Sequence, residues 1–276
     1  MMAIADNDAA AHPFDDAIRL DTIEPGRVRG KTSAEWANMV GPFGGMTAAL
    51  LLRAIEIHPD RIGDPVALTV NFTAPVADGE FDITASVVRT NRSNQHWMVE
   101  LSQDGAVVTN ATAVFGLRRD TWSDTERVRP AVPGPDEIEQ SGLPPMVVWA
   151  RNYDMRFVDG AIPGKGADPA ASSTTTLWAR DRVGRPLDFP ALAAVSDIFY
   201  PRVFLRRGAP VPAGTISLTT YFHAGVEELA TAGGDFVLCQ AHANRFSRGY
   251  FDQSAEIWSR TGELLVTTHQ LVYFKT

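Results

Sequence analysis

The chain has 276 residues, of which 45% are apolar and 21% charged, a composition typical of an ordinary globular protein with room for two domains. Its formal net charge of −8 and pI near 5.2 argue against a nucleic-acid-binding protein, which would usually carry a basic face, but they leave room for a phosphorylated ligand held by a local arginine cluster. The single cysteine, Cys239, lies in an apolar run, so we expect a buried thiol, with neither an intrachain disulfide nor a cysteine metal cluster.

The N-terminal segment is acidic and lacks the apolar core of a signal peptide. No stretch of the chain approaches the roughly 18 uninterrupted apolar residues of a membrane span. We therefore expect a flexible N-terminus over residues 1–22, no membrane-spanning segment and a cytoplasmic protein.

Residues 23–120 have the pattern of one domain. A strand-like segment at Arg27–Gly30 precedes a loop and the run Gly44–Glu56, which is apolar on nearly every side over about three turns. Such a run predicts a helix that is buried on most of its surface. Strand patterns bounded by turn residues follow at Val66–Phe72, Phe81–Thr90, Gln95–Gln103 and Val107–Leu117.

Residues 121–146 are rich in proline and charge and predict a linker, and residues 147–276 then repeat the element order of the first domain. The apolar run of this second half is Ala191–Tyr200, and its strand patterns are Thr174–Arg182, Thr215–Phe222, Asp235–Arg245, Tyr250–Ser259 and Leu264–Phe274. A buried helix followed by consecutive antiparallel strands, present twice, predicts an α+β protein with a tandem (double) hot-dog fold. In that fold each half wraps an antiparallel sheet around a long buried helix.

Three ordered matches support a duplication. Val107–Phe115 matches Leu265–Tyr273 at an offset of 158, Ala67–Phe72 matches Ser217–Phe222 at 150, and the apolar stretch after Phe43 matches the one after Phe189 at 146. At these offsets three polar residues of the second half are aligned with residues of different chemistry in the first half. Asp197 is aligned with Leu51, Thr215 with Pro65, and Gln270 with Thr112. Conversely, the glycine pair Gly44-Gly45 of the first half is aligned with Pro190-Ala191 in the second. This asymmetry predicts one composite site per chain.

Each of these polar residues also has an ordinary structural interpretation. Asp197 is the only charged residue of its apolar run, and a buried carboxylate must be paired, exposed at a site or catalytic; a salt bridge to Arg202 or Arg206 would satisfy it. Gln270 on an apolar strand face could hydrogen-bond the backbone. Thr215 after Gly214 could reflect β propensity alone.

Several short motifs occur in the order and spacing of a known family. They are Phe43-Gly44-Gly45, Leu177-Trp178-Ala179-Arg180, Ser196-Asp197, Gly214-Thr215-Ile216, Phe222-His223 and Thr267-Thr268-His269-Gln270. Together they resemble the acyl-CoA thioesterase II family of double hot-dog hydrolases, from about residue 25 to the end. The resemblance implies hydrolysis of a fatty acyl-CoA by a water that Asp197, Thr215 and Gln270 hold. The sequence departs from the family pattern at Thr47, near which a glutamine commonly follows the glycines, and after Gln270, where a smaller residue is common.

We interpret Asp197 as a general base or orienter of the water, with Thr215 and Gln270 fixing the direction of attack. The backbone at Gly44, Gly45 or Met46 opens a helix and could polarise the thioester oxygen, because amide groups at a helix N-terminus are unpaired. Glycine there would let a substrate carbonyl approach closely.

Two matching stretches, 88–93 and 244–249, carry arginines that could bind the phosphates of coenzyme A: Arg89, Arg92, Arg245 and Arg248. They could equally be solvated strand ends. His223 is structural or lines the site, and Met46, Leu50, Phe199 and Phe204 are candidates for an acyl tunnel.

Other chemistries find no support in the sequence. The chain has no Gly-x-Ser-x-Gly, HExxH or Asp-x-x-x-x-His motif, so we expect no serine hydrolase, no metal or cofactor, and no hydratase. The alternative to the enzyme is a non-catalytic acyl-CoA-binding or scaffold protein on the same fold. Strand edges and the family resemblance suggest a homo-oligomer, a dimer or tetramer.

Overall fold

The computed structural model describes residues 12–142, 144 and 146–275. Its N-terminal half contains α1 (Pro13–Ala17), β1 (Asp21–Glu24), β2 (Arg27–Lys31), η1 (Ala34–Trp36), α2 (Gly44–Glu56), β3 (Asp64–Phe72), β4 (Glu80–Thr90), β5 (Asn94–Gln103) and β6 (Ala106–Gly116). The C-terminal half contains η2 (Pro135–Glu137), η3 (Val148–Asn152), β7 (Tyr153–Asp159), β8 (Thr175–Asp181), α3 (Phe189–Val195), α4 (Val203–Arg207), β9 (Ala213–Phe222), α5 (Val226–Ala232), β10 (Val237–His242), β11 (Phe246–Ser247), β12 (Tyr250–Ser259) and β13 (Leu264–Phe274).

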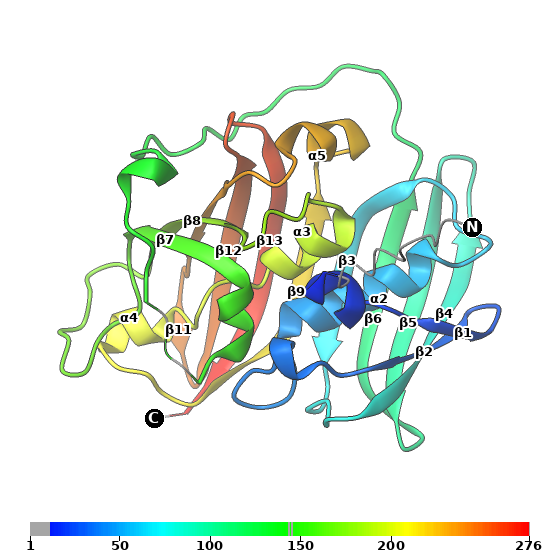
Figure 1. Cartoon of the computed structure of the whole chain (residues 1–276), viewed down its shortest axis with the longest axis horizontal. Helices are drawn as coiled ribbons and strands as arrows, with labels where there is room; N and C mark the ends of the chain where they lie inside the picture. Colours follow the sequence, from blue (N-terminus) through cyan, green and yellow to red (C-terminus); the bar gives the residue numbers. More distant parts are fainter. Residues whose placement is uncertain (1–11, 143, 145, 276) are drawn as a thin grey trace, which may run out of the picture.

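The strands form one continuous sheet in the order β1-β2-β4-β5-β6-β3-β9-β13-β12-β10-β8-β7, with β11 paired to β12 (Figure 1). Every pairing is antiparallel, and β3 and β9 join the two halves at the centre. Read outward from this junction, the two halves have equivalent strand orders. Helices α2 and α3 lie together on one face of the sheet (Figure 1). The predicted tandem hot-dog fold is confirmed.

The register places an approximate twofold axis at the β3/β9 junction. Thr69 pairs with Thr219 there, 150 residues apart, and their hydroxyl oxygens are 3.0 Å apart. Both halves also carry a β-bulge at the same place. Val66 on β3 has no paired residue on β6, and Ile216 on β9 has none on β13. The duplication therefore extends to an irregularity of the sheet, which a chance match of apolar patterns would not reproduce.

The same register corrects the alignment of the last strands. Thr69 pairs with Thr112 on β6, whereas Thr219 pairs with His269 on β13, so the offset between β6 and β13 is 157 and not 158. The counterpart of Gln270 is consequently Ala113. A slip of one residue moves a side chain to the other face of a sheet. Burial agrees with the corrected pairing, because Gln270 and Ala113 are buried while Thr112 and His269 are exposed.

The second buried helix is shorter than the sequence predicts. Helix α3 ends at Val195, and the chain turns through Ser196 and Asp197 instead of remaining helical to Tyr200. The Ser196 hydroxyl donates to the carbonyl of Leu192 at 2.8 Å, a local bond that competes with continued helix. Pro201 follows this turn and lacks the backbone N–H that a continuing helix would need. The turn takes Asp197 out of the helix.

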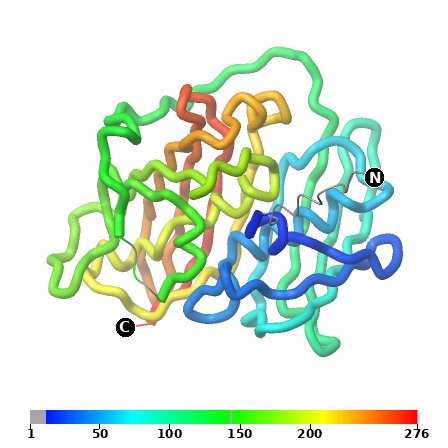
Figure 2. Tube along the Cα trace, in the orientation of Figure 1, coloured from blue at the N-terminus to red at the C-terminus, as the bar shows by residue number. Residues whose placement is uncertain are grey.

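One hydrophobic core extends through both halves and includes α2, α3 and the helix-facing side chains of the sheet. The segment after β6 arches over the end of the sheet to reach the second half (Figure 2) and contacts it where the Trp178 indole donates to the carbonyl of Pro133 at 2.9 Å. Of the terminus predicted to be flexible, residues 1–11 lie outside the described residues. Pro13–Ala17 forms α1, and its Phe14 is buried against the edge of Trp36.

Candidate active site

The structure brings Asp197, Thr215 and Gln270 into one hydrogen-bonded chain. The side-chain nitrogen of Gln270 donates to Asp197 Oδ1 at 2.8 Å, and the Thr215 hydroxyl donates to Gln270 Oε1 at 3.2 Å. Because a hydroxyl hydrogen points at the amide oxygen, the amide nitrogen of Gln270 is the atom that faces the carboxylate. The turn after α3, the start of β9 and the middle of β13 thus hold three polar side chains in fixed orientations.

The Asp197 carboxylate has no cationic partner among the described residues. Both arginines that could have paired with it bind neutral oxygens instead: Arg206 donates to the carbonyls of Ala170 and Ala171, and Arg202 donates to carbonyl, hydroxyl and amide oxygens. Burial raises the pKa of Asp197 to about 7, against the opposing effect of hydrogen bonds from Gln270 and the Gly45 amide. Asp197 can therefore exchange a proton near neutral pH.

The glycine pair of α2 serves the packing of the two helices. A Cβ on Gly44 would lie 2.6 Å from Asp197 Oδ2, and one on Gly45 would lie 2.3 Å from the carbonyl of Ala194 in α3. Any larger residue would separate α2 from the carboxylate and from α3. From the sequence these glycines were expected to polarise the thioester oxygen and to let the substrate approach; that they also leave room for the Asp197 carboxylate was not foreseen.

The three backbone positions predicted to polarise the substrate are not equivalent. The Gly45 amide donates to Asp197, and the Met46 amide donates to the carbonyl of Phe43 at 3.0 Å. The Gly44 amide has no partner in the described part of the chain. It is the first amide of a helix of 13 residues, where the helix dipole is positive.

A cavity of about 430 Å³ opens above Asp197, Thr215 and Gly44. Both halves line it; the remaining lining residues are Asn38, Met39, Val40, Pro42, Thr47, Phe72, Thr73, Ala74, Pro75, Val76, Ala213, Gly214 and Tyr273. Gln270 lies just beneath, 3% exposed. Sequence reasoning missed the loops at 38–42 and 72–76, which carry no polar motif. The loop at 38–42 contains the adjacent apolar residues Met39 and Val40, and the structure shows that both are exposed.

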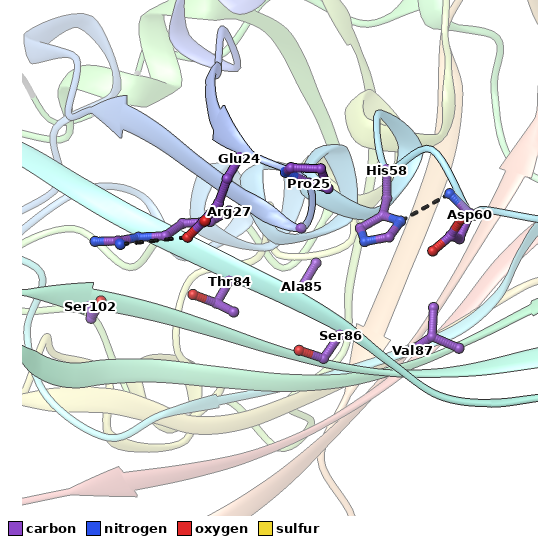
Figure 3. A pocket seen from close by; sticks show the side chains of 11 residues that line it. Glu24, Pro25, Arg27, His58, Asp60, Thr84, Ala85, Ser86, Val87 and Ser102 are labelled. Carbon is purple, nitrogen blue, oxygen red and sulfur yellow. Dashed lines mark hydrogen bonds and ion pairs between the residues drawn. The ribbon is translucent and has the colours of Figure 1, made fainter.

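A larger hollow of about 560 Å³ lies elsewhere, between the β1–β2 turn, the segment after α2 and β4 (Figure 3). Its His58 packs against the edge of Trp97 and accepts a hydrogen bond from the Asp60 amide at 3.1 Å. None of the predicted site residues lines this open hollow. Size alone therefore does not identify the functional cavity, whereas the convergence of Asp197, Thr215 and Gly44 does.

The predicted arginines divide between the two ends of the sheet. Arg248 follows Ser247, which pairs with Tyr250 on β12. Tyr250 pairs in turn with Tyr273 on β13, and Tyr273 pairs with Gly214, which lines the cavity. Arg89 and Arg92 flank the β4–β5 turn, beside the start of β3 and away from its cavity end. Arg89 donates to Asn91 at 2.9 Å, and the backbone of Arg245 binds Asp252. Only Arg248 and its neighbour Arg245 lie at the end of the sheet that holds the cavity.

The remaining predicted residues lie away from this cavity. His223 is at the opposite end of β9 from Thr215 and contacts the hydroxyl of Thr267 at 2.9 Å; burial, and then Arg118, lower its pKa. The proposed tunnel residues are buried and do not line the cavity: Met46, Leu50, Phe199 and Phe204. Cys239 is a buried free thiol whose pKa is raised by that burial.

Metal ligands and membrane-spanning helices are absent from the described residues. No group of three or more His, Cys, Asp or Glu side chains there could hold a metal ion. No helix in the same residues combines the length and apolarity needed to cross a bilayer.

Comparison with known proteins gives matches over both halves. The family model of the acyl-CoA thioesterase N-terminal domain matches residues 32–116, and that of the acyl-CoA thioesterase C-terminal domain matches residues 126–274. No curated protein sequence matches the chain at a significant level.

Solved structures agree in fold along nearly the whole chain. A conserved hot-dog protein of unknown function from Alicyclobacillus acidocaldarius is 48% identical, with a TM-score of 0.92 over 96% of this chain and 98% of its own. An acyl-CoA thioesterase II, TesB2, from Mycobacterium marinum is 20% identical, with a TM-score of 0.76 over 95% and 98%. The tesB protein of Mycobacterium avium subs paratuberculosis is 18% identical, with a TM-score of 0.78 over 95% and 98%. The last two likenesses show the shared fold.

Proposed function

Because the chain belongs to the acyl-CoA thioesterase family and is a thioester hydrolase, we propose that it cleaves a fatty acyl-CoA with a water activated by Asp197. The observation that carries this proposal is the Gln270–Asp197 hydrogen bond of 2.8 Å at the floor of a cavity shared by both halves. The raised pKa of Asp197, about 7, suits a general base at neutral pH.

In the proposed reaction Asp197 removes a proton from water, and the hydroxide oxygen attacks the thioester carbonyl carbon. Collapse of the tetrahedral intermediate breaks the carbon–sulfur bond, and Asp197 returns the proton to the departing coenzyme A thiolate. The products are a carboxylic acid and free coenzyme A. Thr215 and Gln270 keep the carboxylate and the water in line, since each side chain is oriented by the next.

The backbone of α2 supplies the complementary charge in this proposal. The unpartnered Gly44 amide opens α2 beside Asp197 Oδ2, so it can donate to the oxygen that becomes negative during attack. Gly45 then acts on the base, through its hydrogen bond to Asp197, and Met46 serves the helix alone.

The position of Arg248 supports a role in binding coenzyme A. It lies three strands from Gly214, about 14 Å at the usual strand spacing, on the sheet end that holds the cavity. A phosphate at that distance is compatible with a thioester over Asp197, because coenzyme A is an extended molecule. Arg89 and Arg92 would have to contact a different part of the ligand.

The test is release of free thiol from acyl-CoAs of several chain lengths by the purified protein. We expect hydrolysis by the wild type and a loss of about 10²–10⁴-fold in kcat/KM for Asp197→Asn, the usual contribution of a general base. Circular dichroism should show the variant folded. A wild type that binds acyl-CoA but releases no thiol would instead support a binding protein, and near-normal turnover by Asp197→Asn would refute the assignment of the base.

A further inference from the structure

Arg202 is a fully buried cation without a carboxylate partner among the described residues. It donates only to neutral oxygens: the carbonyls of Tyr200 and Ser173, the hydroxyl of Thr175 and the side-chain oxygen of Gln253. Burial lowers its pKa to about 10, which still leaves it charged at neutral pH. Neutral partners satisfy its hydrogen bonds but leave a net positive charge inside the protein.

Gln253 is bound to this cation and has an unused hydrogen-bond donor. Its side-chain oxygen accepts from Arg202 Nε at 3.1 Å, and since arginine only donates, this bond fixes which way the amide points. Nε2 of Gln253 has no hydrogen-bond partner among the residues that the structure describes, although Gln253 is only 1% exposed. Buried amide groups are nearly always paired, so this nitrogen is suited to an oxygen acceptor.

The unused donor lies beside the proposed catalytic chain. Gln253 on β12 is the registered neighbour of Gln270 on β13, and both face the helices. On the same face, Thr268 pairs with Thr220 in the next row, and neither of these buried hydroxyls has a partner in the described part of the chain. Three unpartnered polar groups therefore adjoin Gln270 on a face that is otherwise largely apolar.

We propose that the acyl group of the substrate is short and ends in a carboxylate, which Gln253 and the charge of Arg202 recognise. Registered neighbours on adjacent strands are about 5 Å apart, about the extended length of four carbon–carbon bonds. With its thioester carbon beside Gln270, next to the water that attacks it, a five-carbon acyl group places its second carboxyl group beside Gln253. The amide then donates to a carboxylate oxygen, and the guanidinium behind it supplies the opposite charge. This specificity rests on the proposed function, because it uses the position of that water.

The experiment compares kcat/KM for glutaryl-CoA and pentanoyl-CoA, which differ by the terminal carboxylate. We expect the wild type to favour glutaryl-CoA at least tenfold. Gln253→Glu keeps an acceptor for Arg202, removes the free donor and places a negative charge against the substrate carboxylate, so the preference should fall at least tenfold. Gln140→Glu, at an exposed position that does not line the cavity, makes the same charge change and should leave the preference unchanged.

Each outcome decides one of the two proposals. Equal or poorer use of glutaryl-CoA by a wild type that hydrolyses pentanoyl-CoA overturns the specificity and leaves the proposed function intact. If the wild type hydrolyses neither but hydrolyses longer acyl-CoAs, the specificity is overturned and the proposed function stands. If it hydrolyses no acyl-CoA, the proposed function fails, and calorimetric affinities for the two molecules decide the specificity by the same tenfold criterion. Should Gln253→Glu fail to fold, Gln253→Met removes the donor without adding charge and must also lower the preference.

Discussion

The two halves of the molecule share a strand order and a bulge, yet they contribute different chemistry to the cavity. The C-terminal half provides the side chains Asp197, Thr215 and Gln270, whereas the N-terminal half provides backbone, through Gly44 and Gly45. At the shared bulge, Thr215 in one half corresponds to Pro65 in the other. The two halves therefore carry different side chains at equivalent positions of the sheet. We infer from this difference that the two copies of the fold share one site.

The contribution of the N-terminal half can be broken at Gly44. A methyl group in Gly44→Ala would approach Asp197 Oδ2 to 2.6 Å, so the carboxylate or the start of α2 must shift. We expect kcat/KM to fall about 10²-fold, the scale of a lost oxyanion donor. Gly164→Ala, whose added Cβ meets nothing within 4 Å, is the matched control. Activity of Gly44→Ala within twofold of wild type would contradict the division of the site.

The strand pattern and the helix Gly44–Glu56 were predictable from the sequence because periodic burial leaves a periodic pattern. The strand β7 was missed although Tyr153–Phe157 alternates apolar and polar residues, because five alternating residues are a short signal. Helix α3 was predicted too long because the apolar run Ala191–Tyr200 does not reveal the turn at Ser196. The three catalytic candidates were predicted from residue chemistry and family resemblance, and the structure places them together. Arg202 was considered only as a partner of Asp197, and Gln253 gave no signal, because a lone glutamine in a strand becomes informative only when its partners are known.

The C-terminal half contributes the ionisable carboxylate of the site, and the dependence of kcat/KM on pH tests this. Asp197 is the acidic group of the site, and its pKa is raised to about 7 by burial, so the base form is lost as pH falls below that value. We expect kcat/KM to fall about tenfold per pH unit below pH 6. Thr215→Val should retain the profile at lower activity, because it leaves the carboxylate in place. A profile flat from pH 5 to 8 in the wild type would exclude Asp197 as the base.

Burial of the Asp197 carboxylate in the C-terminal half should also make the free energy of unfolding depend on pH. The folded pKa of about 7 exceeds the usual value of 3.8, so the folded state holds a proton that the unfolded chain has released. The associated stability is present below pH 4 and is lost as pH rises to about 7. Compared with Asp197→Asn, the wild type should lose roughly 3 kcal/mol of unfolding free energy between pH 5 and 8. Denaturant unfolding at both pH values measures this difference, and parallel curves for the two proteins would count against the raised pKa.

The junction itself is where the halves are most alike, and a substitution there should act on stability without affecting chemistry. Thr69 and Thr219 share a hydrogen bond of 3.0 Å between their hydroxyls, half-buried on the face of the sheet opposite the helices. Thr69→Val and Thr219→Val each leave one hydroxyl that water can still reach, so each should cost only about 0.5–1.5 kcal/mol. Because the axis relates the two positions, the two single costs should be nearly equal, and the double variant should cost less than their sum. Unfolding free energies of the three variants test this double-mutant cycle. A large inequality between the single variants would mean that the halves already differ at their junction, and that the asymmetry is not confined to the cavity.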